Sequence, residues 1–271
     1  MKKITSRDNA TFKQLRLLAE SSRERRKLGK TVLDGMHLVS AWFDRYGPPD
    51  LLAVSESGAQ QAEISEFLAL RRQTDPYVFG DALFKEVSPV STPTGILALI
   101  SIPHPPTLAA TTGSCVLLEA IQDAGNLGAI LRSSAAAGIT DIFLGQGCAQ
   151  AWSPRILRAA MGAHFLLRIH EHAALDQIID NFDGISVSTR LDADATLFEL
   201  DLTGPVAWVF GNEGGGLTTD VAGQTAHAVK IPMPGKAESL NVAAAASICL
   251  FEEVRQKYAI KKRDGPASPP A

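Results

Sequence analysis

Hydrophobic and polar positions form two patterned regions, separated by a stretch that follows neither a helical nor an extended pattern. From Ser101 to Gly113, prolines and small polar residues interrupt the apolar positions, which is typical of a linker. We therefore expect one domain at residues 1–100, a linker at 101–113 and a second domain at 114–260. The residues that follow, 261–271, are rich in lysine, proline and alanine, and we expect a disordered tail there.

The first region alternates short helices and strands. Apolar positions recur at helical spacing after Asn9, a residue suited to the N-cap, and a charged loop is expected after Glu20. The pattern predicts helices at residues 9–20, 37–46 and 59–72, and strands at 31–33, 51–54, 77–79 and 95–100. Such an alternation indicates a small α/β domain.

The second region contains apolar strands separated by helices. The pattern predicts strands at residues 116–121, 141–144, 185–189, 206–210 and 228–231, and helices at 127–137, 154–161, 173–181 and 240–257. Continuous apolar strands of this kind favour a parallel sheet covered on both faces. Ligands of such sheets bind beyond the carboxyl ends of the strands.

The composition limits the classes of protein to which this chain can belong. With 271 residues and 45% hydrophobic content, the chain can bury a substantial core. No apolar run approaches the roughly 20 residues that span a bilayer, and no signal-like stretch follows Met1, so we expect a cytoplasmic protein. Neither the three cysteines (Cys115, Cys148, Cys249) nor the pair His170 and His172 has zinc-site spacing, and we expect reduced thiols and no metal.

Charge is unevenly distributed along the chain. The whole sequence carries a net charge of −3, but its first thirty residues hold ten basic and three acidic side chains, a local net charge of +7. A basic stretch of this kind suits the phosphate backbone of RNA. A solvated helix face is the alternative interpretation.

The first candidate site segment follows the strand predicted at 116–121. Asn126 stands where a helix is expected to begin, and Arg132 lies about a turn and a half further on, from where its guanidinium could reach back towards the loop. A helix N-cap at Asn126 and a surface cation at Arg132 are the alternative roles.

The second segment follows the strand predicted at 206–210. Four of the six residues at 211–216 are glycine, which favours close approach of the backbone to a ligand, although a plain turn would also use them. Glu213 could orient a substrate or accept N–H bonds from neighbouring loops. The glycine spacing and the lack of a suitably placed acidic residue argue against a nicotinamide-dependent oxidoreductase.

The third segment, residues 231–242, precedes the last predicted helix. Two prolines and a glycine force an irregular loop, in which Ser239 and Asn241 are polar. Ser239 is an alternative N-cap for that helix. The alanine run at 243–246 allows close approach of another backbone, either within the domain or across a dimer interface.

Together the three segments resemble the motifs of the SpoU/TrmH family of the SPOUT superfamily of RNA methyltransferases. The first motif is matched by Asn126-x-Gly128-x-x-x-Arg132 and the second by Gly211-Asn212-Glu213-Gly214 with Gly216-Leu217. The third is matched by Ile231-Pro232-Met233 through Ser239-Leu240-Asn241-Val242. The resemblance covers residues 114–258. Residues 31–35 and 92–98 are also similar to the family's N-terminal substrate-binding domain, so this role is expected for 1–100.

The resemblance implies a SPOUT domain with a deep trefoil knot, preceded by the small α/β substrate-binding domain, and a homodimer. It implies an enzyme that transfers a methyl group from S-adenosylmethionine to a ribose 2′-hydroxyl of RNA. Main-chain groups around Gly211, Ile231 and Leu240, with Thr189 nearby, would hold the cofactor. The catalytic set would be Asn126, Arg132, Glu213, Ser239 and Asn241.

The resemblance also bears on which RNA is the substrate. The separate N-terminal domain favours ribosomal RNA over transfer RNA, by analogy with the family. Two alternatives stay open, namely the same chemistry on transfer RNA and a catalytically silent RNA-binding protein of the same fold.

Overall fold

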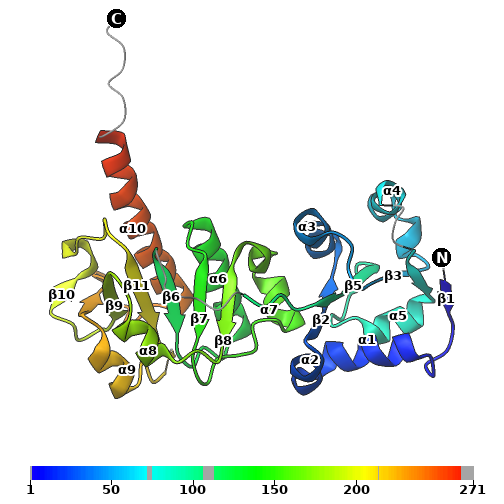
Figure 1. The fold of residues 1–271 in the computed structure, drawn as a ribbon, viewed down its shortest axis with the longest axis horizontal. Helices are drawn as coiled ribbons and strands as arrows, with labels where there is room; N and C mark the ends of the chain where they lie inside the picture. The colour runs from blue at the N-terminus through cyan, green and yellow to red at the C-terminus, as the bar shows by residue number, and fades with distance from the viewer. Residues whose placement is uncertain (1, 72–74, 106–112, 213, 264–271) are drawn as a thin grey trace, which may run out of the picture. The chain divides into compact units, whose positions relative to one another are not determined.

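A computed structural model describes residues 2–71, 75–105, 113–212 and 214–263 (Figure 1). Two compact units form, one from Met1–His104 with Gln150–Phe165 and the other from Pro105–Ala149 with Leu166–Ala271. We call them the N-terminal and the C-terminal unit. The segment Gln150–Phe165 therefore packs with the N-terminal unit, although it lies in the range predicted for the second domain.

The N-terminal unit contains a five-stranded mixed sheet in the order β1-β4-β3-β5-β2, in which β5 runs antiparallel to β3 and β2. Its elements are β1 (Lys2–Ile4), α1 (Ala10–Glu20), α2 (Ser22–Leu28), β2 (Lys30–Asp34), α3 (Met36–Tyr46), β3 (Leu51–Ser55), α4 (Ala62–Leu70), β4 (Tyr77–Phe79), α5 (Asp81–Val87), β5 (Ile96–Ser101) and α7 (Pro154–Ala159). Asn9 caps α1, because its side chain accepts hydrogen bonds from the backbone N–H groups of Thr11 and Phe12. Helix α1 buries its apolar face in the core of this unit.

The predicted charged loop after Glu20 is wrong, because these residues form α2. Ser21 caps this helix by accepting a hydrogen bond from the N–H of Glu24, and Gly29 ends it in the left-handed conformation at φ 61°. The charged residues of this stretch are good helix formers, and the caps at Ser21 and Gly29 set where the helix begins and ends. One of them, Arg25, points into the protein and is only 5% exposed.

The segment Gln150–Phe165 completes the N-terminal unit through specific contacts. The hydroxyl of Thr31 on β2 donates a 2.7 Å hydrogen bond to the carbonyl of Trp152. The ring of Trp42 on α3 lies edge-on to Phe165, with centroids 5.6 Å apart. His164 is fully buried, and burial lowers its pKa to about 4, so that the imidazole stays neutral.

The C-terminal unit contains a seven-stranded parallel sheet in the order β10-β12-β9-β11-β6-β7-β8. Its elements are β6 (Cys115–Leu118), α6 (Ala124–Ala136), β7 (Asp141–Leu144), β8 (Arg168–Glu171), α8 (Leu175–Asp180), β9 (Ile185–Thr189), β10 (Ala195–Thr196), β11 (Val206–Phe210), α9 (Thr219–Gln224), β12 (His227–Lys230) and α10 (Val242–Arg263). The central strands β6 and β11 are entirely buried. Helix α10 packs against α6, where the hydroxyls of Ser247 and Ser133 lie 2.7 Å apart.

The expected α/β class with a parallel sheet in the second region is confirmed. The sequence pattern did not reveal β1, α5, β8, β10 or α9, which are short and lack a clear apolar period. Helix α10 continues to Arg263, and the rest of the expected tail lies outside the described residues. The trefoil knot stays a prediction. Among the helices described, none is long and apolar enough to span a bilayer.

Candidate functional site

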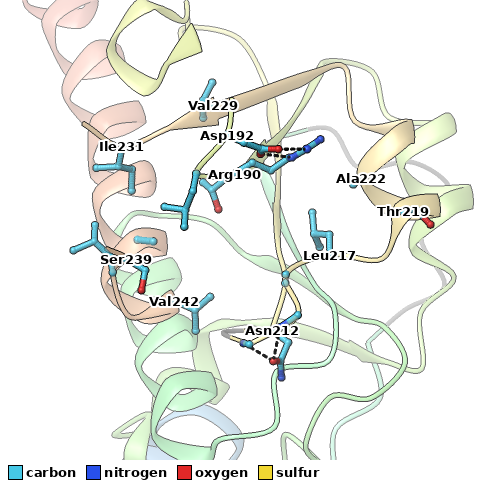
Figure 2. A pocket seen from close by; sticks show the side chains of 18 of the residues that line it. Arg190, Asp192, Asn212, Leu217, Thr219, Ala222, Val229, Ile231, Ser239 and Val242 are labelled. Carbon is cyan, nitrogen blue, oxygen red and sulfur yellow. Dashed lines mark hydrogen bonds and ion pairs between the residues drawn. The ribbon is translucent and has the colours of Figure 1, made fainter. Parts of the chain in front are cut away.

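A cavity of about 630 Å³ lies at the carboxyl edge of β9, β11 and β12 (Figure 2). Its size falls within the range of about 300–1,000 Å³ that is typical of small-molecule sites. The residues that line it come from these strand ends, from α9 and from the loop before α10: Thr189, Arg190, Leu191, Asp192, Gly211, Asn212, Gly214, Gly215, Gly216, Leu217, Thr219, Ala222, Gly223, Val229, Ile231, Met233, Ser239, Leu240, Val242 and Ala245.

All four residues expected to surround the cofactor line this cavity. Thr189 ends β9, Gly211 follows β11 and Ile231 follows β12, while Leu240 lies on the loop before α10. Parallel strands bring their carboxyl ends to one edge, which explains how residues far apart in sequence meet here. Their role in holding a cofactor stays a prediction.

The turn after β11 requires glycine at position 211. A Cβ atom there would lie 2.4 Å from the backbone carbonyl group of Gly216, because the turn folds back on itself. Backbone hydrogen bonds of 3.0 and 2.8 Å join Asn212 and Gly216 across the turn. The expected catalytic residue Glu213 lies outside the described residues. The glycine-rich segment therefore forms a closely folded wall of the cavity.

Asn212 holds this turn in place, a role that the sequence analysis missed. Its Nδ2 donates a 2.9 Å hydrogen bond to the carbonyl of Ala120, and its Oδ1 accepts bonds from the N–H groups of Gly214 and Gly215. Ala120 has a positive φ of 55°, which is uncommon outside glycine. An asparagine opening a glycine-rich turn was the available signal, since its side chain readily bonds the backbone two residues on.

A second residue that the sequence analysis missed, Glu119, ties the end of β6 to α9. Its carboxylate accepts hydrogen bonds from the N–H and the hydroxyl of Thr218, at 2.8 and 2.9 Å. The side chain of Thr218 is in turn the N-cap of α9. Since α9 contributes Thr219, Ala222 and Gly223 to the lining, this carboxylate fixes one side of the cavity.

Asn126 and Asn241 connect the first motif to the third. The Nδ2 of Asn241 donates a 2.8 Å hydrogen bond to the Oδ1 of Asn126. The Oδ1 of Asn241 accepts bonds from the N–H groups of Ala243 and Ala244, at 2.9 and 3.3 Å, so it caps α10. The alternative cap at Ser239 is therefore wrong. That residue lines the cavity instead.

The alternative cap at Asn126 is also wrong, because Asp123 is the N-cap of α6. The helix begins at Ala124, earlier than expected, so Arg132 lies about two turns into it instead of one and a half. Arg132 is exposed and is not one of the residues that line the cavity. The structure thus joins Asn126 to Asn241 and leaves the guanidinium of Arg132 open to solvent.

The lining contains one pair of charged side chains among the described residues, Arg190 and Asp192, which the sequence analysis did not single out. The guanidinium donates two hydrogen bonds to the carboxylate, Nε to Oδ1 at 3.0 Å and Nη2 to Oδ2 at 2.8 Å. These bonds lower the pKa of Asp192 and raise that of Arg190, so both groups are ionised. Within the described part of the chain, no group of three or more metal-binding side chains occurs.

Most cations of the basic stretch at residues 1–30 have partners within the protein. Arg25 is buried, and its guanidinium donates to the carbonyl of Leu18 at 2.7 Å and to the side chain of Gln150 at 2.9 Å, so it cannot serve as a phosphate contact. Ion pairs join Lys3 to Glu56, Arg7 to Glu86, Lys13 to Asp8, Arg16 to Glu20, Lys27 to Glu24 and Lys30 to Asp50. The exposed side chains of Arg23 and Arg26 form no ion pair with any described residue.

Comparison with known proteins agrees with this geometry. Residues 113–251 match the model of the SpoU rRNA Methylase family, and residues 9–98 match an MRM3-like substrate binding domain. An uncharacterized tRNA/rRNA methyltransferase of Synechocystis is 33% identical, over 94% of this chain and 94% of its own length. The 23S rRNA (guanosine(2553)-2′-O)-methyltransferase RlmP of Bacillus subtilis is 30% identical, over 93% and 98%.

A solved structure extends the similarity to three dimensions. The structure of an AdoMet-bound rRNA methyltransferase from Sinorhizobium meliloti aligns with a TM-score of 0.80 and 25% identity, covering 94% of this chain and 97% of that one. The similarity therefore includes both units and not the sheet of the C-terminal unit alone. From the family match and the full-length relatives together, this chain belongs to the SpoU rRNA methylase family.

Proposed function

We propose that this protein transfers the methyl group of S-adenosylmethionine to a ribose 2′-hydroxyl of RNA, with ribosomal RNA as the favoured substrate. The observation that carries the proposal is the convergence of the three motifs. Residues of the second and third motifs line one cavity, and the bond from Asn241 to Asn126 joins the third motif to the first. The Bacillus relative, named for methylating 23S rRNA, matches nearly the whole chain. A ribosomal substrate in turn favours a cytoplasmic location.

The cavity suits the cofactor. S-Adenosylmethionine supplies a methyl group on a positively charged sulfur, which reacts without a metal. Main-chain groups near Gly211, Ile231 and Leu240, with Thr189, hold it in our proposal, and the missing side chain at Gly211 lets the turn close against its own backbone. Hydrogen bonds from main-chain groups need the irregular loops seen at these positions.

Arg132 acts on the hydroxyl in this proposal. A guanidinium is effectively always protonated, so it stabilises the negative charge that develops on the ribose oxygen and does not remove the proton as a simple base. Asn126 and Asn241 hold the first turn of α6 against the start of α10 and so fix the helix that carries Arg132. Ser239 and Glu213 complete the predicted catalytic set by positioning the ribose or Arg132.

Methyl transfer to purified RNA tests this function. The protein is incubated with radiolabelled S-adenosylmethionine and either ribosomal or transfer RNA from a strain that lacks the protein. We expect label in ribosomal RNA, at a position that becomes resistant to alkaline cleavage, as a 2′-O-methyl group requires. Label in transfer RNA alone would show that transfer RNA, and not ribosomal RNA, is the substrate. RNA binding without methyl transfer would identify a catalytically silent RNA-binding protein.

We further propose a homodimer built on α10. Ala244, Ile248, Phe251 and Tyr258 share an exposed face of this helix and recur at the spacing of a heptad, and Phe251 and Tyr258 are 48% and 71% exposed. Ala243 and Ala246 are buried within their own unit, so Ala244 is the member of the alanine run that faces outwards. A two-fold axis would bring this apolar face against its own copy.

Light scattering tests the dimer. Phe251→Glu places a charge in the middle of the apolar face and should give monomers at micromolar concentration, since an unpaired buried charge is costly. Leu70→Glu is the matched control, because Leu70 is an exposed apolar residue of α4, outside the proposed interface. A monomeric wild-type protein would exclude the dimer.

A further inference from the structure

The charged pair Arg190–Asp192 stands in an otherwise uncharged lining. The other described residues of the cavity are glycines, apolar residues and neutral polar residues. Figure 2 shows the pair between Val229, on β12, and Ala222, on α9, with the two side chains joined by their hydrogen bonds. A ligand that fills this cavity therefore meets one cation and one anion at a single place.

The backbone of Arg190 is held in place, although the side chains of the pair are accessible. The N–H of Arg190 donates a 2.9 Å hydrogen bond to the carbonyl of Val229, which continues the pairing of β9 with β12. The side chains of Arg190 and Asp192 remain 47% and 72% exposed. Water screens an ion pair that is this exposed, so the pair adds little to the stability of the fold. A contribution to stability therefore does not explain why the pair lies in the cavity lining.

The pair retains unused hydrogen-bonding capacity. Asp192 occupies Nε and Nη2 of the guanidinium, which leaves Nη1 outside the pair. Arginine binds carboxylates through two or more of its planar donors, and a carboxylate oxygen can accept more than one hydrogen bond. The pair can therefore keep its own bonds while it binds a second carboxylate at Arg190 and a second cation at Asp192.

We propose that Arg190 and Asp192 form the subsite for the aminocarboxylate end of S-adenosylmethionine, with Arg190 binding its carboxylate and Asp192 its ammonium group. The inference rests on the proposed function, since it assigns one part of that cofactor to one part of the cavity. The adenosine part has no net charge and suits the glycine-rich and apolar walls. The aminocarboxylate is the zwitterionic end, so it matches the pair in charge and in hydrogen-bonding groups.

Two ligands separate this subsite from the rest of the cavity. S-Adenosylhomocysteine contains both the adenosine and the aminocarboxylate, whereas 5′-methylthioadenosine contains the adenosine and sulfur but no aminocarboxylate. Calorimetry measures the affinity of each ligand for the wild-type protein, Arg190→Gln and Asp192→Asn. The control Arg7→Gln removes the exposed arginine–carboxylate pair with Glu86 in the N-terminal unit.

Arg190→Gln should bind S-adenosylhomocysteine about tenfold or more weakly, because a charge-assisted hydrogen bond is lost, and should bind 5′-methylthioadenosine within about twofold of wild type. Asp192→Asn should show the same selectivity with a smaller loss, and Arg7→Gln should change neither affinity. Normal binding of 5′-methylthioadenosine also shows that a variant is folded.

Equal losses for both ligands in the two variants would overturn the subsite and identify the pair as a support for the loop. Unchanged affinity for both ligands would overturn it as well. Failure of the proposed function would look different, because the wild-type protein would then bind neither S-adenosylmethionine nor S-adenosylhomocysteine.

Discussion

The basic stretch at residues 1–30 and the loops at the carboxyl edge of the C-terminal sheet differ in what their polar side chains contact. In the basic stretch, most cations are satisfied within the protein, by acids such as Glu56 and Glu86 or, for Arg25, by backbone carbonyls. Around the cavity, by contrast, side chains such as those of Asn212 and Asn241 hold backbone segments from different parts of the chain.

This contrast shows under which conditions a sequence pattern predicts a site. A local charge count ignores acids that folding brings in from distant positions, so the +7 of the basic stretch overstates the charge available to RNA. A position at the end of a predicted parallel strand carries spatial information, because all such ends lie on one edge of the sheet.

Arg132→Ala should produce the largest effect. Methyl transfer should fall about a hundredfold or more, as expected when a group that stabilises developing charge is removed. Affinity for S-adenosylmethionine should stay near normal, since Arg132 is not part of the cavity lining. Calorimetry and single-turnover transfer measure the two quantities on the same preparation. Retained turnover would remove Arg132 from the mechanism.

Arg25→Ala should reduce the free energy of unfolding by about 2 kcal/mol, because it leaves the buried carbonyl of Leu18 without a donor. Urea denaturation measures this change. Arg23→Ala is the matched control on the same helix, and its exposed side chain should leave stability unchanged. If RNA affinity fell in Arg25→Ala without any loss of stability, Arg25 would belong to the RNA surface after all.

The contrast between the basic stretch and the cavity loops also explains which parts of the molecule could be predicted from the sequence. Strands that are entirely buried, such as β7 and β11, were placed at their observed bounds, since burial on both faces leaves a clear pattern. The resemblance to a family assigned Thr189, Gly211 and Ile231 to the cofactor, and the carboxyl ends of β9, β11 and β12 bring these three residues around one cavity. This assignment depended on the resemblance to a family, because a glycine-rich turn alone can be either a plain turn or part of a ligand site.

Other features depend on contacts between distant residues and leave no local signal. The packing of Gln150–Phe165 with the N-terminal unit is one example, because its helix α7 fits the sequence pattern of the second region equally well. The bond of Glu119 to Thr218 and the pair of Arg190 with Asp192 are others. Helix caps were misplaced because several capping residues stand close together before α6 and α10.

Gly211→Ala should weaken the binding of S-adenosylmethionine by about tenfold, because the added Cβ would lie 2.4 Å from Gly216 and force the turn open. Gly204→Ala is the control, because Gly204 lies shortly before β11 and is not one of the residues that line the cavity. Its Cβ would meet no atom within 4 Å and its φ is not in the positive range that alanine avoids. Calorimetry measures both affinities, and equal losses in the two variants would show that the close approach at Gly211 is not what shapes the cavity.

The smallest effect concerns the part of the basic stretch that remains available to RNA. Changing both Arg23 and Arg26 to Ala should reduce the slope of log affinity against log salt by about one to two, since each lost phosphate contact removes close to one released counterion. Arg7→Ala, whose guanidinium is already held by Glu86, should reduce the slope much less. Filter binding to ribosomal RNA over a series of salt concentrations measures the slopes. An unchanged slope in the double variant would leave the whole stretch as a solvated surface, and RNA contacts would then have to come from other cations of the protein.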